Sequence, residues 1–223
     1  MKLRDRFFSR LGVQNVAMIK ISAPIKTHWA EKHHLNFEEL MSAGEYKEKH
    51  RQDMIKWSEE IRNNNYGYFC EAAVKMFKVD VMKCQHTCPI MESGHKGKHT
   101  GGGEFDLVLW IGLRHSSMVR ALAHEKPIWI VSDIRRKTDL KWFRENYGSA
   151  VKTVRVVADD DVRRQRGWVF TTGIDDAETE CNLDDETEWD WKIVNNDNEA
   201  ETELGILSIL TWVGSISCAQ DVS

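Results

Sequence analysis

The run Pro127-Ile-Trp-Ile-Val-Ser-Asp133 constrains the fold more than any other part of this sequence. It is continuously apolar until its last two residues, with no alternation of polar side chains. Strands of this kind occur where helices cover both faces of a parallel sheet. The run therefore predicts a buried strand of an α/β domain.

The residues that follow repeat the pattern at short spacing. Thr138 is a predicted helix N-cap, and Gly148 is predicted to end that helix. Residues 153–158 and 190–195 are predicted strands, and 159–161 cap a short basic helix between them. This order implies right-handed crossovers and a parallel sheet with helices on both faces, a three-layer α/β/α domain.

The first half of the chain is predicted to be mainly helical. Residues 16–22 form a predicted strand, and helical stretches are expected over 26–41, 46–64 and 68–77. No hydrophobic period runs through residues 77–120, so we expect an inserted loop or disordered segment there.

Charge is distributed unevenly along the sequence. The chain carries 35 acidic and 31 basic residues, a net charge of −4. The segment from Asp175 to Glu203 alone carries −12, which leaves +8 on the rest. A basic body suits an anionic ligand or partner, and charge alone leaves open a nucleic acid or a phosphorylated small molecule.

Polar and cationic residues follow the predicted strands, where ligands of open α/β sheets bind. Arginine pairs with phosphate oxygens through two parallel hydrogen bonds. The candidate ligand residues are Arg62, Arg135, Arg136, Arg155, Arg163, Arg166 and Asn195. The alternative for each arginine is a solvated basic surface that pairs with the acidic segment; for Arg135 and Arg136, directly after a buried strand, we favour ligand binding.

Other chemical groups give weaker signals. Asp133 can orient a metal-bound water or substrate hydroxyl, or cap the next turn, and the sequence favours neither role. Asp175-Asp176 fits a solvated loop better than an acid/base pair. The set Cys84-x3-Cys88-x6-His95-x3-His99 has zinc-ligand residue types, but its middle spacer is short. We favour a chance set and expect no protein-held metal.

The sequence also limits location and partners. It has no apolar N-terminal run typical of a signal peptide, and its five cysteines lack the spacing of a disulfide scaffold. The apolar tracts Phe105–Leu113 and Leu204–Ile216 are shorter than the ~20 residues of a membrane span. We expect a cytosolic monomer without membrane or nucleic-acid partners.

Long strings of this sequence closely resemble the animal-type phosphomevalonate kinase family. In the first half they include Leu35-Asn-Phe37 and Arg51-Gln-Asp-Met-Ile-Lys-Trp57. In the second half they include Pro127-Ile-Trp-Ile-Val-Ser-Asp-Ile-Arg-Arg136, Trp142-Phe-Arg-Glu-Asn-Tyr-Gly148, Arg164-Gln-Arg-Gly-Trp-Val-Phe170 and Gly173-Ile-Asp-Asp-Ala-Glu-Thr-Glu-Cys181. The resemblance covers residues 9–76 and 121–196.

The resemblance implies one nucleoside-monophosphate-kinase-like domain over residues 1–223. Such an enzyme transfers the γ-phosphoryl group of ATP, with Mg2+, to mevalonate 5-phosphate. Arg135 and Arg136 would bind substrate and support transfer, assisted by Arg62, with Asn195 contacting ligand. Arg155, Arg163 and Arg166 would lie on or beside the lid over ATP.

The sequence departs from the family pattern at three places. The family's first strand and phosphate loop would precede Ser9, and no G-x-x-x-x-G-K motif is present. Residues 77–120 interrupt the family pattern, and residues 197–223 form a divergent tail. Without the loop we expect weak or absent turnover, so a non-catalytic phosphomevalonate-binding protein is the alternative, and a nucleic-acid-binding protein is a further one.

Overall fold

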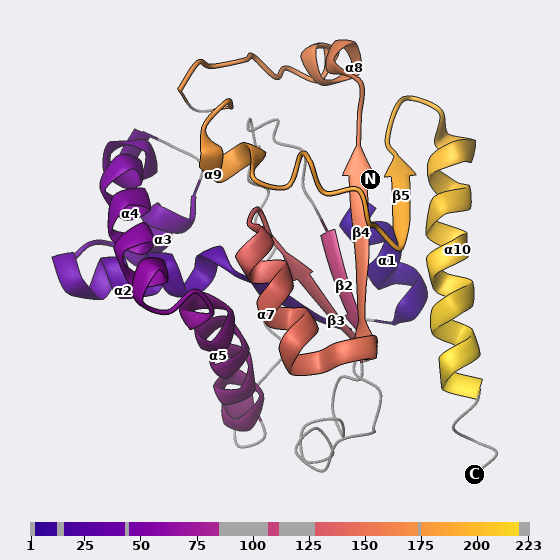
Figure 1. Ribbon diagram of the computed structural model, residues 1–223, viewed down its shortest axis with the longest axis horizontal. Helices are drawn as coiled ribbons and strands as arrows, with labels where there is room; N and C mark the ends of the chain where they lie inside the picture. The colour runs from indigo at the N-terminus through magenta and orange to yellow at the C-terminus, as the bar shows by residue number, and fades with distance from the viewer. Residues whose placement is uncertain are drawn as a thin grey trace. The chain divides into compact units, whose positions relative to one another are not determined.

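The computed structural model describes residues 3–12, 16–42, 45–84, 107–111, 128–173 and 175–218 (Figure 1). The chain divides into two compact units. The first comprises residues 1–18 and 102–223, and the second comprises residues 19–101. Each unit has its own hydrophobic cluster.

Five strands form one sheet in the order β1-β3-β2-β4-β5. The strands are β1 (Val16–Lys20), β2 (Leu107–Ile111), β3 (Ile128–Ser132), β4 (Val151–Val157) and β5 (Trp191–Val194). β2 is antiparallel to both β3 and β4, whereas β4 and β5 are parallel. β3, β4 and β5 therefore run in the same direction, and their carboxyl ends lie at one edge of the sheet.

The helices described in the first unit include the predicted helix that ends at Gly148 and the predicted short basic helix after Asp159, with three others that were not predicted. The described helices are α1 (Leu3–Leu11), α7 (Lys137–Tyr147), α8 (Asp160–Gln165), α9 (Glu178–Cys181) and α10 (Glu199–Cys218), with a 3-10 turn at Gly148–Ala150. α7 begins two residues earlier than expected: its N-cap is Arg136, not Thr138. It ends at Gly148, as predicted, and a φ of +55° there favours glycine.

The core of the first unit lies around β3, β4 and β5. Four consecutive β3 residues, from Ile128 to Val131, are buried, which confirms a strand covered on both faces. Ile193 of β5 packs with Ile206 and Ile209 of α10 in the same cluster. The α/β class expected from the sequence is confirmed, but the sheet is mixed and not wholly parallel, because β2 is antiparallel to both of its neighbours.

The second unit contains the helices α2 (Ser22–His33), α3 (Phe37–Met41), α4 (Glu45–Asn64) and α5 (Tyr68–Cys84). The helical stretch predicted over 26–41 is two helices. His34 has a left-handed φ of +55° and ends α2. The side chain of Asn36 then caps α3 by accepting hydrogen bonds from the Glu38 and Glu39 backbone N–H groups, at 3.0 and 3.3 Å.

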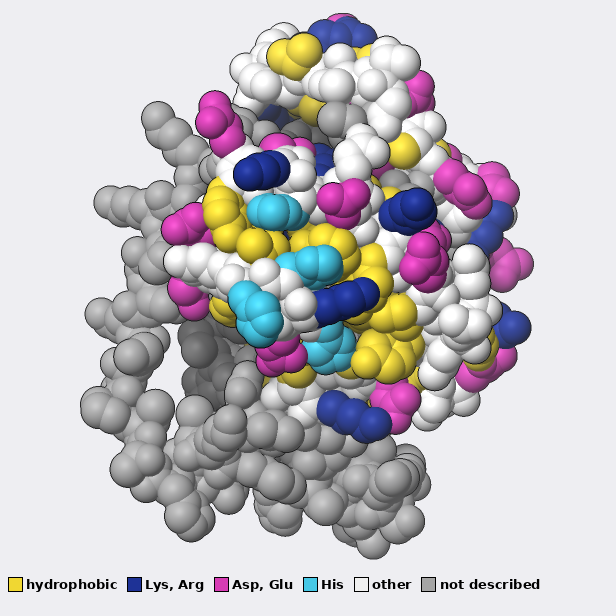
Figure 2. All heavy atoms as spheres, turned by 90° about the vertical axis from the view of Figure 1, so that its left-hand side faces the viewer, with side chains coloured by type: hydrophobic (Ala, Val, Ile, Leu, Met, Phe, Trp, Pro, Cys, Tyr) yellow, Lys and Arg dark blue, Asp and Glu magenta, His cyan; other side chains and the backbone are white. Residues whose placement is uncertain are grey.

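Aromatic and histidine side chains pack together in this second unit. Trp29 is buried beside Leu40 and Met54, and its ring lies 3.8 Å from that of His33. Figure 2 shows histidine and hydrophobic side chains gathered on one face. Trp29 therefore belongs to the core of the second unit.

The segment predicted as a loop over 77–120 differs from that expectation where the structure describes it. α5 continues to Cys84, and β2 lies between β3 and β4. Cys88, His95 and His99 of the zinc-like set lie outside the described residues. None of the helices in the described ranges is long and apolar enough to cross a membrane.

Gly205 allows α10 to lie close to β5. A Cβ at Gly205 would meet Ile193 Cγ1 at 3.1 Å, whereas one at Gly214, on the same helix, would have no neighbour within 4 Å. We expect Gly205→Val to lower the free energy of unfolding by about 1–3 kcal/mol relative to Gly214→Val. Both variants carry the same helix-propensity change, so equal stabilities in urea titrations would contradict this close packing.

Asp190 joins the start of β5 to β4. Its carboxylate accepts hydrogen bonds from Thr153 N at 2.8 Å, Thr153 Oγ1 at 2.9 Å and Lys152 Nζ at 2.6 Å. Burial alone would raise the pKa of Asp190, but the hydrogen bonds from Lys152 and Thr153 outweigh it and hold that pKa below its usual range. A carboxylate with a lowered pKa stabilises the fold above its unfolded pKa, and this contribution is lost as the pH falls through the folded pKa.

We therefore expect Asp190→Asn to lower the free energy of unfolding by about 1–3 kcal/mol at pH 7. The deficit should shrink at pH 3, below the unfolded pKa of about 4, because the carboxyl then gains a proton more readily in the unfolded chain than in the fold. Urea titrations at both values, with the exposed Asp161→Asn as control, measure this difference. A deficit of the same size at both pH values would contradict it.

Candidate functional site

Three strand ends of the first unit meet at one edge of the sheet. Asp133 follows β3, Ala158 follows β4 and Asn195 follows β5. The Asn195 N–H donates to Val157 O at 2.7 Å, so the pairing of β4 with β5 reaches this edge. Figure 1 shows α8 directly beyond the end of β4. This is the edge at which α/β sheets bind ligands.

The turn after β3 carries Arg135 and Arg136. Asp133 has a φ of +65°, a left-handed conformation that non-glycine residues rarely adopt. The next residue, Ile134, is fully buried and anchors the turn. Arg135 and Arg136 follow, and Arg136 is the N-cap of α7, its carbonyl accepting from Asp139 N at 3.1 Å.

Arg135 forms an ion pair with a carboxylate of the acidic segment. Its Nη1 donates a charge-assisted hydrogen bond to Glu180 Oε1, on α9. The Arg135 side chain is 37% exposed and that of Glu180 is 19% exposed. The ion pair is therefore partly desolvated, and the Arg135 side chain remains accessible to solvent.

Arg155 holds the next part of the acidic segment. It donates to Leu183 O at 2.7 Å and to Asp184 Oδ1 at 2.9 Å, and its side chain is only 12% exposed. Its guanidinium also lies over the Trp189 ring at 5.6 Å. The backbone of Lys137 adds a further tie, a 2.8 Å hydrogen bond to Asn182 Oδ1.

Arg163 in α8 and Arg166 directly after it also have carboxylate partners. Arg163 lies 3.7 Å over the Trp168 ring and donates to Asp160 at 3.3 Å. Arg166 donates to Asp197 at 3.0 Å. The sequence had placed both beside a bound nucleotide, and that role stays a prediction.

Asn196 is a connecting residue that the sequence analysis did not single out. Its Oδ1 accepts from Asp159 N at 2.9 Å, and its Nδ2 donates to Asp159 Oδ2 at 2.8 Å. This two-way bond ties the end of β5 to the start of α8. The only sequence signal for it was an asparagine directly after a predicted strand.

Arg62 belongs to the second unit, in the last turn of α4. Its guanidinium lies over the Phe69 ring at 5.3 Å. Its predicted assistance to substrate binding stays a prediction.

These contacts combine the two interpretations offered for the arginines. The arginines lie at the ligand-binding edge, and several also pair with the acidic segment. Glu180 and Asp184 were not predicted as partners individually. The signal that pointed to them was the opposite charge of Asp175–Glu203 and the rest of the chain.

Comparison with known proteins decides the family. Residues 3–87 match the family model for phosphomevalonate kinase. A phosphomevalonate kinase of Drosophila melanogaster is 35% identical over 202 residues, which cover 90% of this chain and 84% of the fly protein. The chain belongs to the phosphomevalonate kinase family. This confirms the resemblance found in the sequence and the class of ATP-dependent kinase expected from it.

The acidic pair at the start of α9 has a structural role in this kinase. Asp175 accepts hydrogen bonds from Thr171 N at 2.7 Å and Trp168 Nε1 at 3.2 Å, and Asp176 accepts from Gly173 N. These bonds close the turn between α8 and α9, which agrees with the loop interpretation of the pair.

Cys181 is not poised as a nucleophile in this kinase. Its Sγ donates to Asp175 O at 3.2 Å. Burial, followed by the negative charge of Asp184, raises the pKa of the Cys181 thiol. The thiol therefore stays protonated at neutral pH.

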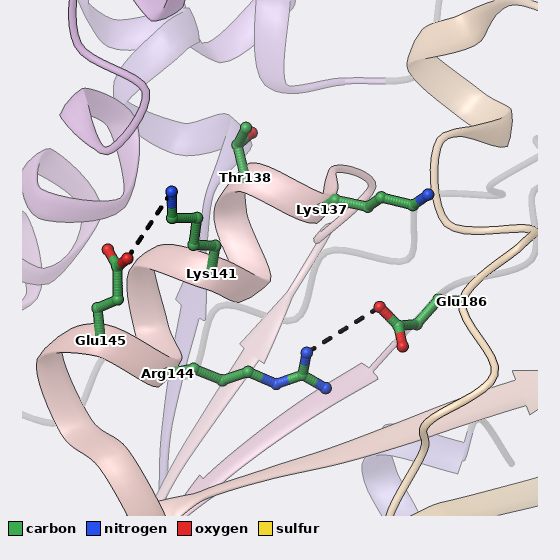
Figure 3. Close-up of a pocket in the computed structure, with 6 residues that line it drawn as sticks. All are labelled: Lys137, Thr138, Lys141, Arg144, Glu145 and Glu186. Carbon is green, nitrogen blue, oxygen red and sulfur yellow. Dashed lines mark ion pairs between the residues drawn. The ribbon is translucent and has the colours of Figure 1, made fainter.

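A second polar region of this kinase lies along α7 (Figure 3). It is an open groove of about 500 Å³, lined by Lys137, Thr138, Lys141, Arg144, Glu145 and Glu186. Arg144 Nη1 lies 4.0 Å from Glu186 Oε2 and Lys141 Nζ lies 3.8 Å from Glu145 Oε1. The groove contains none of the predicted ligand residues, and Arg144 is therefore a matched control for Arg135.

The backbone of Asp133 gives a test of the turn that carries Arg135. Alanine and glycine variants both lack the carboxylate and differ only in the Cβ, which is disfavoured at a φ of +65°. We expect Asp133→Ala to have a free energy of unfolding about 1 kcal/mol lower than that of Asp133→Gly. Urea titration of both variants measures the difference, and an alanine variant as stable as the glycine variant would contradict a strained turn.

Proposed function

We propose that this chain transfers the γ-phosphoryl group of ATP to mevalonate 5-phosphate, giving mevalonate 5-diphosphate and ADP. A phosphate oxygen of the acceptor forms a bond to the γ-phosphorus as the bond to the ADP oxygen breaks. The observation that carries this proposal is the position of Arg135 and Arg136, directly after buried β3 at the carboxyl edge of the sheet. The family assignment supports the choice of reaction.

The proposed roles follow from the charge that phosphoryl transfer spreads over the phosphate oxygens. Arg135 and Arg136 bind the acceptor phosphate and stabilise this charge. Arg62 and Asn195 assist acceptor binding. Arg155, Arg163 and Arg166 bind or surround the nucleotide, in part through the segments that they hold in place.

Mg2+ would neutralise charge on the ATP phosphates. In kinases it is held by one or two carboxylates together with phosphate oxygens and water. No group of three His, Cys, Asp or Glu side chains suited to a metal occurs among the described residues. We propose that Mg2+ arrives with the ATP phosphates and that Asp133, which follows β3, orients one of its bound waters.

We further propose that the protein works as a monomer in the cytosol. Cys70 and Cys181 are free thiols, as expected in a reducing compartment.

The direct test is ADP release by the purified 223-residue chain with Mg-ATP and mevalonate 5-phosphate. We expect Arg135→Ala to lower turnover about 100- to 1000-fold. The control is Arg144→Ala, because Arg144 is also a partly exposed, ion-paired arginine (42% exposed, against 37% for Arg135). Its turnover should stay within about twofold of wild type, since charged surface positions contribute little.

Three other outcomes would contradict the proposal. Equal losses in both variants would remove the special role of Arg135. Saturable binding of mevalonate 5-phosphate without turnover would make the chain a binding protein. Neither turnover nor binding would leave only the family relationship.

A further inference from the structure

We propose that Glu180 is a positioning residue for phosphoryl transfer, which orients the guanidinium of Arg135 toward the reacting phosphate. This inference rests on the proposed function. It adds a carboxylate of the acidic segment to a site that was predicted from its arginines and Asn195. Glu180 acts through Arg135 and does not itself contact the substrate.

The pair has the burial expected of an orienting contact. Glu180 is the less exposed partner, at 19%, whereas Arg135 keeps 37% of its side chain exposed. Glu180 therefore approaches the guanidinium from the protein side. An arginine side chain otherwise samples many rotamers, and a partly desolvated charged partner restricts them.

The contact leaves Arg135 able to bind phosphate. A guanidinium has five N–H donors, and the contact with Glu180 uses Nη1. The other donors can make the paired hydrogen bonds that arginine forms with phosphate oxygens. A carboxylate on one side and a phosphate on the other fit a single planar guanidinium.

The segment that carries Glu180 is fixed to the sheet independently of Arg135. Leu183 is buried, and its carbonyl accepts from Arg155 at 2.7 Å. Asn182 accepts from the Lys137 backbone at 2.8 Å. These contacts lie two and three residues after Glu180, so the carboxylate projects from an anchored frame.

The anchoring separates two roles that a carboxylate beside Arg135 can have. If Glu180 stood in for the substrate phosphate, it would have to leave before the substrate bound, and its removal would strengthen binding. If it orients Arg135, its removal weakens both binding and transfer. An anchored frame favours the orienting role.

The test compares Glu180→Ala, Glu180→Gln and the control Glu178→Ala, which changes an exposed carboxylate of the same short helix. We expect Glu180→Ala to lower kcat/KM for mevalonate 5-phosphate about 10- to 100-fold, because small displacements of a reacting group have effects of this size. KM for ATP should be unchanged. Glu180→Gln, which can still accept a hydrogen bond, should recover most of the loss.

A double variant tests that Glu180 acts through Arg135. Glu180→Ala should have little further effect on kcat/KM in an Arg135→Ala background, because coupled residues are non-additive. Independent, multiplicative losses would overturn the inference. Urea titration of each variant checks that folding is retained.

Calorimetric binding of mevalonate 5-phosphate keeps this inference separate from the proposed function. Wild-type turnover with an unaffected Glu180→Ala variant would overturn the inference alone. Without wild-type turnover, weaker binding by Glu180→Ala would support the inference, and tighter or unchanged binding would overturn it. A wild-type chain that neither binds nor turns over would overturn both.

Discussion

Pairing between the acidic segment and the basic edge of the sheet is the interaction on which the first unit depends. Without it, several arginines and a lysine would lie at one edge without opposite charge, at a cost in free energy from mutual repulsion. Three acidic residues of the segment after α8 supply the partners. Glu180 pairs with Arg135, Asp184 pairs with Arg155, and Asp185 pairs with Lys137. The Lys137 hydrogen bond lowers the pKa of Asp185, so this partner stays ionised.

This pairing also explains how one edge can serve both folding and phosphate binding. Arg155 is largely buried and gives hydrogen bonds to a backbone carbonyl as well as a carboxylate, so it contributes to the fold. Arg135 has a similar carboxylate partner but stays more exposed. Arg155 therefore mainly stabilises the fold, whereas Arg135 remains exposed enough to bind a phosphate.

The sequence predicted the elements with strong local signals. The buried run of β3, the end of α7 at Gly148 and the placing of Arg135 after a strand follow from hydrophobic continuity and turn chemistry, which neighbouring residues determine. β2 was not predicted, because a five-residue strand without a period is indistinguishable from a loop segment. Its antiparallel pairing with β3 and β4 depends on contacts between distant residues. Glu180 lies 45 residues after Arg135 in the sequence. Their pairing also depends on contacts between distant residues, so it could not be predicted from local sequence signals.

A crystal structure of the chain with mevalonate 5-phosphate tests most directly whether this edge is the acceptor site. The account predicts a phosphate oxygen within hydrogen-bonding distance of both Arg135 and Arg136, with the Arg135–Glu180 pair still formed. A phosphate bound away from these arginines, or one that had displaced Glu180 from Arg135, would contradict it.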